Sequence, residues 1–138
     1  MIVVDTHLAV CLLLPGNADH RAEEVLTKDS RWVVPGLLFL EFKNVLAGHL
    51  RRGLMSLKDA AAYMAEAEAV LEQAPFSASH ERVLELSLAS GCPSYGCEFV
   101  GLAEMLDIPL ITADPPVLQA FPGLAFSPSD YLDSRPAF

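Results

Sequence analysis

The chain has 138 residues, of which 52% are hydrophobic and 20% charged, so it has enough apolar side chains for the core of one domain. That composition excludes intrinsic disorder and collagen-like repeats, and no apolar run approaches the roughly 20 residues that cross a bilayer. A net charge of −9 argues against a broad basic surface for nucleic acid, but not against a nuclease whose acids bind metal ions.

Short apolar runs alternate with stretches of helical periodicity. Strands are predicted at residues 1–5, 31–34, 108–112 and 123–126, with a short edge strand at 74–76. Helices are predicted from the N-cap Thr6 to Pro15, from 17 or 19 to 28, and over 37–52, 57–73, 79–89, 94–106 and 115–120, before a polar tail. Strands separated by helices imply right-handed crossovers, so we expect one α/β domain over residues 1–138, with a parallel sheet covered on both faces.

Two acids follow buried strands of this expected sheet. Asp5 ends the first apolar run, and Asp114 comes just after the run at 108–112. Ligands of such sheets bind at the carboxyl ends of the strands, so the two side chains are candidates for one shared site. The alternative is that each acid only caps the helix that follows it.

Glu41 is a third candidate, because it lies in the first turns of a largely apolar helix, where an unpartnered carboxylate is costly. Asn44 lies three residues on and projects from the same face, where it could orient Glu41 or bind a metal-bound water. The alternative is that Glu41 points into solvent. Converging carboxylates suit Mg²⁺ or Mn²⁺, which prefer oxygen ligands and can promote phosphodiester hydrolysis.

Four short motifs carry a resemblance to a known family. They are residues 2–6 (IVVDT), 41–46 (EFKNVL) after Pro35, 94–103 (SYGCEFVGLA) and 110–114 (LITAD). In this order and at these spacings, which span almost the whole chain, they resemble PIN domains. The chain is similar to the short VapC-type toxins of toxin–antitoxin pairs.

The resemblance implies a PIN-like three-layer α/β/α sandwich with a central, mainly parallel sheet. It implies a Mg²⁺- or Mn²⁺-dependent ribonuclease that cleaves RNA, is neutralised by a cognate antitoxin and forms a homodimer. Asp5, Glu41 and Asp114 match three of the family's four acids and would be the catalytic metal ligands. Thr6 and Asn44 match its polar neighbours, which position water or substrate. We expect a cytoplasmic protein, because its three cysteines show no paired spacing that would indicate disulfides. We expect no membrane partner, because no apolar run is long enough to cross a bilayer.

The chain departs from the family pattern at the fourth acid, where Gly96 stands in place of an aspartate. Glu98 is a possible auxiliary acid, although two helical positions turn its side chain roughly 200° away from position 96. An irregular first turn would let Glu98 approach the site. A second hypothesis therefore stays open, in which the chain is a catalytically impaired binding module that recognises RNA or an antitoxin without cleavage.

Overall fold

The computed structural model describes residues 1–16 and 21–134. Its sheet consists of β1 (Ile2–Val4), β2 (Trp32–Val34), β3 (Leu71–Gln73), β4 (Leu110–Ile111) and β5 (Ala125–Phe126). All neighbouring strands are parallel, in the order β3-β2-β1-β4-β5. The helices are α1 (Thr6–Leu13), α2 (Arg21–Lys28), α3 (Leu37–Arg51), α4 (Leu57–Val70), α5 (His80–Ser90), α6 (Ser94–Leu106), α7 (Pro115–Ala120) and α8 (Pro128–Asp133).

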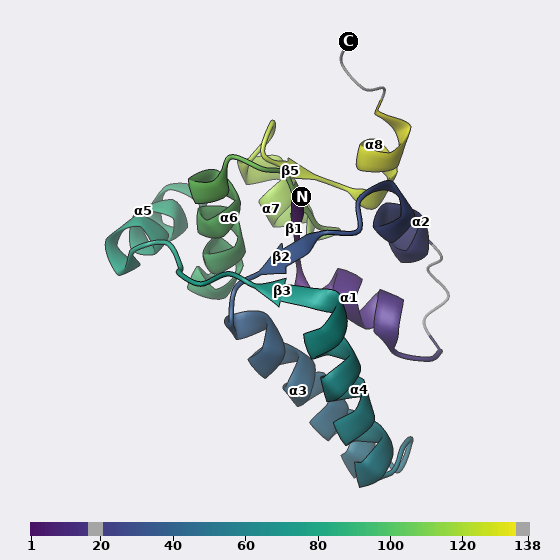
Figure 1. Ribbon diagram of the computed structural model, residues 1–138. Coiled ribbons are helices and arrows are strands. Elements are labelled where there is room, and N and C mark those ends of the chain that lie inside the picture. Colours follow the sequence, from purple (N-terminus) through teal and green to yellow (C-terminus); the bar gives the residue numbers. More distant parts are fainter. Residues whose placement is uncertain (17–20, 135–138) are drawn as a thin grey trace.

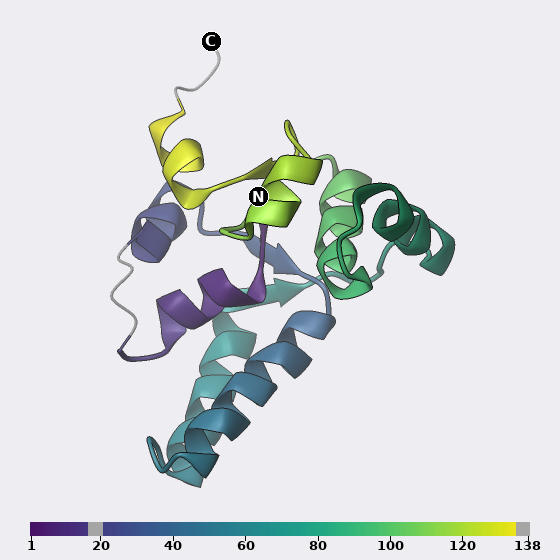
Figure 2. The ribbon, with the colours of Figure 1, turned by 180° about the vertical axis from the view of Figure 1, so that it is seen from behind.

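The helices cover the sheet from both sides, as Figures 1 and 2 show. On one side α6 contacts β1 and β4, and α5 packs against α6. On the other side α1 contacts α2, α3 and α4. The paired helices α3 and α4 extend away from the sheet (Figure 1). This arrangement confirms the expected three-layer sandwich, and its sheet is wholly parallel.

The central strands are buried on both faces of the sheet. Every residue of β1 and β2 is buried, and Val3 lies between Val33 and Leu110 in the ladders to β2 and β4. Such continuous apolar runs are typical of parallel strands that have helices on both faces. This packing holds the carboxyl ends of β1 and β4 side by side, where the candidate acids follow.

The expected edge strand at 74–76 and the helix to residue 73 are both wrong. Helix α4 ends at Val70, and β3 pairs Leu71 with Trp32 of β2. Burial of Leu71 and the hydrogen bonds to β2 override the helix propensity of this segment. Pro75 lacks the amide hydrogen that would extend the ladder.

The segment after residue 126, expected only as a polar tail, contains α8. Ser127 accepts a hydrogen bond from the backbone amide of Asp130, and Pro128 occupies the first turn. The helix packs against α2 and β5, where Lys28 lies 4.3 Å from the centre of the Tyr131 ring. The Ser-Pro-x-Asp pattern is a helix-start signal that sequence reasoning overlooked.

Other predicted elements are confirmed. The helices over 94–106 and 115–120 match α6 and α7, and the strands at 1–5, 31–34, 108–112 and 123–126 each contain a shorter observed strand. The predicted start of the second helix at residue 17 or 19 lies outside the described residues.

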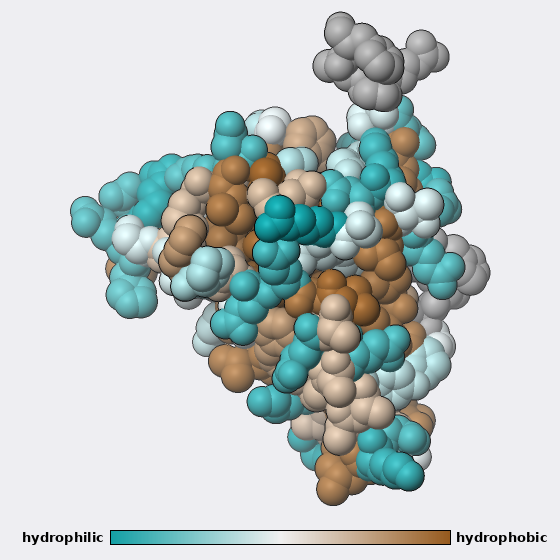
Figure 3. Space-filling model, in the orientation of Figure 1, coloured by the Kyte–Doolittle hydropathy of each residue, from teal (hydrophilic) through white to brown (hydrophobic). Residues whose placement is uncertain are grey.

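The visible surface mixes residue types. In Figure 3 hydrophobic residues gather in separate patches, one of them beside β3, with hydrophilic side chains between them. Within residues 1–16 and 21–134, no helix is long and apolar enough to cross a membrane.

Candidate functional site at the carboxyl edge of the sheet

Asp5 and Asp114 are linked through Thr112. The Thr112 hydroxyl donates a 2.6 Å hydrogen bond to Oδ2 of Asp5 and accepts a 3.1 Å bond from the backbone amide of Asp114. Thr112 is only 2% exposed, so its hydroxyl depends on these partners. The two acids therefore share one edge of the sheet, as the parallel order of β1 and β4 requires.

The two acids differ in whether they cap a helix. Oδ1 of Asp5 accepts a 2.9 Å hydrogen bond from the amide of Leu8, so Asp5 is the N-cap of α1. The expectation that Thr6 caps this helix is wrong, because Thr6 is already helical and its hydroxyl is used elsewhere. Asp114 occupies the N-cap position of α7, but its side chain makes no capping hydrogen bond. Helix capping therefore accounts for one of the two hydrogen bonds of the Asp5 carboxylate. It gives no structural reason for the carboxylate of Asp114.

Burial sets the electrostatics of Asp5. Desolvation raises the pKa of Asp5, and the nearby charge of Asp114 raises it further. Hydrogen bonds from Thr112 and Leu8 and the proximity of His7 lower it in part. The net rise means that burial outweighs the hydrogen bonds and the nearby His7, which favour the ionised carboxylate.

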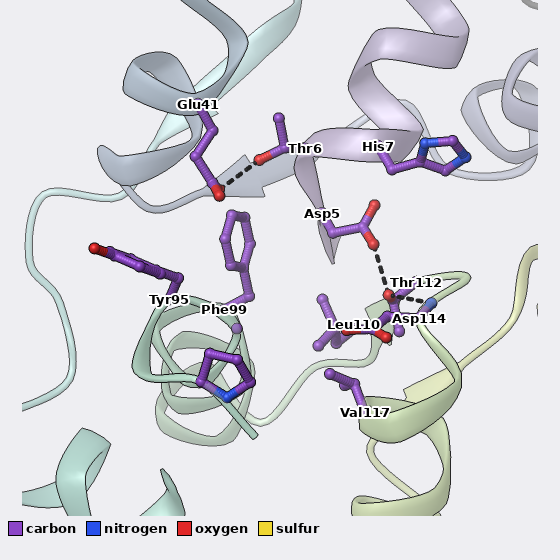
Figure 4. Close-up of a pocket in the computed structure, with 12 residues that line it drawn as sticks. Asp5, Thr6, His7, Glu41, Tyr95, Phe99, Leu110, Thr112, Asp114 and Val117 are labelled. Atoms are coloured by element: carbon purple, nitrogen blue, oxygen red, sulfur yellow. Dashed lines mark hydrogen bonds between the residues drawn. The ribbon is translucent and has the colours of Figure 1, made fainter. Parts of the chain in front are cut away.

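Glu41 approaches the same site from α3. Its Oε1 accepts a 2.8 Å hydrogen bond from the hydroxyl of Thr6, and the side chain is half-buried. Glu41 therefore points toward α1, as Figure 4 shows, and the solvent-facing alternative is wrong.

The candidate acids and their hydroxyl partners line one pocket of about 360 Å³ (Figure 4). Its polar lining includes Asp5, Thr6, Glu41 and Asp114. An apolar wall faces them, formed mainly from α6, and it includes Tyr95, Gly96 and Phe99. A second hollow of about 230 Å³ is lined by Asp5, His7, Ala113 and Asp114, so the two hollows share the acids of the sheet edge.

Two of the candidate residues lie elsewhere. Asn44 is exposed on α3 and is not among the residues that line this pocket. Glu98 lines a different hollow, together with Leu40 and Phe76. The regular start of α6 turns Glu98 away from the acids.

Position 96 has room for a side chain. Gly96 lines the pocket, and a Cβ atom built on it would lie 3.8 Å from Cγ2 of Val117, an ordinary van der Waals distance. The backbone of Gly96 is not in the left-handed region that favours glycine. The fold therefore accommodates aspartate at this position, with its carboxylate at the pocket wall.

The chemistry of the donors fits a hard divalent cation. The candidate ligands are carboxylates, and the lining residues that the structure describes include no lysine or arginine. As the side chains lie, no group of three or more His, Cys, Asp or Glu within the described ranges is close enough to hold a metal ion. Binding at all three acids would require their side chains to converge further.

Sequence reasoning quoted Thr112 within a motif but gave it no role. A hydroxyl directly after a buried strand, two residues before a candidate acid, was a usable signal, because such a position faces the same sheet edge. The hydrogen bonds that make it important depend on the pairing of β1 with β4.

The chain is similar to known proteins in sequence and in fold. No family model matches the chain. Ribonuclease VapC3 of Pyrobaculum aerophilum is 30% identical over 127 residues, which cover 89% of this chain and 96% of that protein.

Solved structures also match over nearly the full length. The crystal structure of PAE2754 from Pyrobaculum aerophilum has a TM-score of 0.75 at 18% identity, covering 95% of this chain and 92% of that one. A toxin–antitoxin complex from Klebsiella pneumoniae has a TM-score of 0.67 at 15% identity, covering 93% and 98%. At these identities the structural matches show a shared fold.

Proposed function

Because the chain belongs to the VapC family of PIN-domain proteins, we propose that it is an endoribonuclease that hydrolyses RNA phosphodiester bonds with the help of Mg²⁺ or Mn²⁺. The observation that carries this proposal is that Asp5, Glu41 and Asp114, from three different elements, line one pocket. The name of the ribonuclease relative supports RNA as the substrate.

Asp5, Glu41 and Asp114 would hold the cation, which supplies charge for activating water and stabilising the leaving oxygen. Thr112 positions the carboxylate of Asp5 and the backbone of Asp114. Thr6 orients Glu41 from the first turn of α1. These hydroxyls fix the directions of the carboxylates, as outer-shell partners do in metal sites.

The roles of Asn44 in positioning substrate and of Glu98 as an auxiliary acid stay predictions, and the positions of the two side chains restrict what each could do. Asn44 lies outside the pocket lining, so a role in positioning substrate would involve a part of the RNA beyond the pocket. Glu98 would need a rearranged first turn of α6 to serve as an auxiliary acid.

We also propose that a cognate antitoxin silences the enzyme, that the chain forms a homodimer and that it works in the cytoplasm. The structural similarity to a component of the Klebsiella toxin–antitoxin complex supports an antitoxin partner. An acidic pocket within a chain of net charge −9 would attract a basic segment of such a partner.

Gly96 supports a second candidate function, that of a binding module without cleavage. A fourth carboxylate at this position would add one negative charge and one oxygen ligand at the pocket wall. Its absence weakens cation binding, but it also reduces repulsion between the remaining acids.

The experiment is Mn²⁺-dependent cleavage of a panel of structured and single-stranded RNAs by the wild type, Gly96→Asp and Asp5→Asn. Asp107→Asn is a matched control, because Asp107 is an exposed acid outside the pocket, in a left-handed conformation that asparagine tolerates. We expect the wild type and the control to cleave RNA and Asp5→Asn to lose at least about 100-fold in rate.

The pattern of the other results separates the two candidate functions. A silent wild type with activity in Gly96→Asp would contradict the enzyme and support the binding module. Equal activity in the wild type and Asp5→Asn would contradict a role of the pocket carboxylates in cleavage.

A further inference from the structure

The wall of the pocket opposite the acids is built from the start of α6. Tyr95 lies there in the first turn and is 65% exposed, whereas Phe99, one turn further, is only 4% exposed. Both line the pocket. Phe99 therefore belongs to the core, and Figure 4 draws its ring between Tyr95 and Asp5, while the ring of Tyr95 stands at the edge of the pocket on the side of Glu41.

The surface beside Tyr95 is open because the next residue is glycine. Gly96 has no side chain, so the wall between Tyr95 and α7 is bare backbone at that point. A Cβ atom built there would lie 3.8 Å from Cγ2 of Val117, which shows how near α7 is. Pro93 and Val117 complete an apolar lining next to the carboxylates. A planar apolar group could lie against this wall while a phosphate attached to it reaches the acids.

Charge limits how the pocket could hold a polynucleotide. Most proteins gain nucleic-acid affinity from lysine and arginine contacts to phosphates. Of the described residues that line this pocket, none is lysine or arginine, and His7 alone can carry a positive charge. Base stacking on an aromatic ring is the contribution that remains, and it does not require a cation.

We propose that Tyr95 is the stacking platform for one unpaired nucleobase of the RNA, adjacent to the phosphate that lies at Asp5 and Asp114. The inference deepens the proposed function, on which it rests for the identity of the polynucleotide. Since every base has an aromatic face, such a platform favours single-stranded over paired RNA and discriminates little between bases.

The test measures binding rather than cleavage. A fluorescein-labelled single-stranded RNA hexamer and its abasic counterpart are titrated with the 138-residue chain in a low-salt buffer that contains Ca²⁺ in place of Mg²⁺ or Mn²⁺, and fluorescence anisotropy gives each Kd. The variants are Tyr95→Ala, Tyr95→Phe, which keeps the ring, and Leu88→Ala, which removes an exposed apolar side chain outside the pocket.

We expect Tyr95→Ala to weaken binding of the base-containing hexamer at least about fivefold. Tyr95→Phe and Leu88→Ala should match the wild type. The abasic hexamer should bind the wild type and Tyr95→Ala equally weakly. Circular dichroism of each variant checks that the fold is intact.

Equal affinities of Tyr95→Ala and the wild type for the base-containing hexamer would overturn the proposal, as would a wild type that does not prefer bases over abasic sites. Because no cleavage is measured, this result is independent of the nuclease. RNA that is bound through Tyr95 but never cleaved would contradict the proposed function and leave the base platform standing.

Discussion

The protein contains two groups of carboxylates in opposite electrostatic situations. On the surface, Glu104 and Glu85 both pair with Arg82, at 2.7 Å and 3.0 Å, and the pKa of Glu104 is lowered. At the sheet edge, the pKa of Asp5 is raised, because burial outweighs its hydrogen bonds and no arginine or lysine of the described pocket lining faces it. Glu85 and Glu104 are thus neutralised by Arg82, whereas Asp5 has no arginine or lysine among the described residues that line its pocket.

Ion-paired surface acids and the acids of the proposed site differ in their partners. A carboxylate with an arginine partner contributes to a surface ion pair of modest value. A carboxylate that is buried, hydrogen-bonded and without a cation is held in a state that costs stability, which is typical of functional sites. Asp5 is buried and hydrogen-bonded and its pKa is raised, which agrees with its proposed role in the pocket.

Thr112→Val is expected to have the largest effect on the pocket acids, through their affinity for Mn²⁺. The variant keeps the shape of the side chain but removes the hydrogen bonds to Asp5 and to the amide of Asp114. We expect Mn²⁺ affinity, measured by calorimetric titration, to fall about 10- to 100-fold. Thr112→Ser retains the hydroxyl and should keep most of the affinity. Equal losses in both variants would point to packing rather than to the hydrogen bonds.

The next effect is a pH dependence of the metal-free protein. Because the folded state raises the pKa of Asp5, it binds the proton more tightly than the unfolded chain does. The contribution of Asp5 to stability is therefore fully present below the ordinary carboxylate pKa of about 4 and is lost as pH rises through the raised value.

Urea unfolding in chelator, between about pH 4 and pH 7, measures this contribution. We expect the free energy of unfolding of the wild type to decrease relative to that of Asp5→Asn as pH rises. The opposite slope would mean that Asp5 has a cationic partner in the folded chain, and the contrast with Glu104 would disappear.

The smallest effect is expected from Arg82→Gln at the surface cluster. The pairs with Glu85 and Glu104 are exposed, so solvent and salt screen them. A thermal scan at low salt should show a slight decrease in Tm, which about 1 M NaCl removes. A large decrease that persists in high salt would show that the surface cluster is as structurally important as the core.

Local patterns were enough for much of the fold. The β-branched runs before Asp5 and Asp114 indicated buried parallel strands, and the strand ends indicated a common edge for the two acids. Helix-start signals at Ser56 and Ser79 correctly marked α4 and α5, whose N-caps accept the expected hydrogen bonds. These features depend on neighbouring residues, so the sequence carries them directly.

Where prediction failed, contacts between distant segments decided the outcome. The sequence pattern predicts a helix through Leu71, but Leu71 pairs with Trp32 in the sheet, because burial beside β2 outweighs local helix propensity. The helix at 128–133 packs on α2, about a hundred residues earlier in the chain. Sequence periodicity holds no information on such partners.

At the site, the sequence by itself determined which acids are available and that position 96 lacks one. Only the tertiary structure decided that Glu41 turns toward Thr6, that Thr112 joins Asp5 to Asp114, and that Glu98 faces another hollow. The reason is physical: residue types and helical spacing are local properties. The burial that raises the pKa of Asp5 arises from strands and helices that meet only in the folded chain.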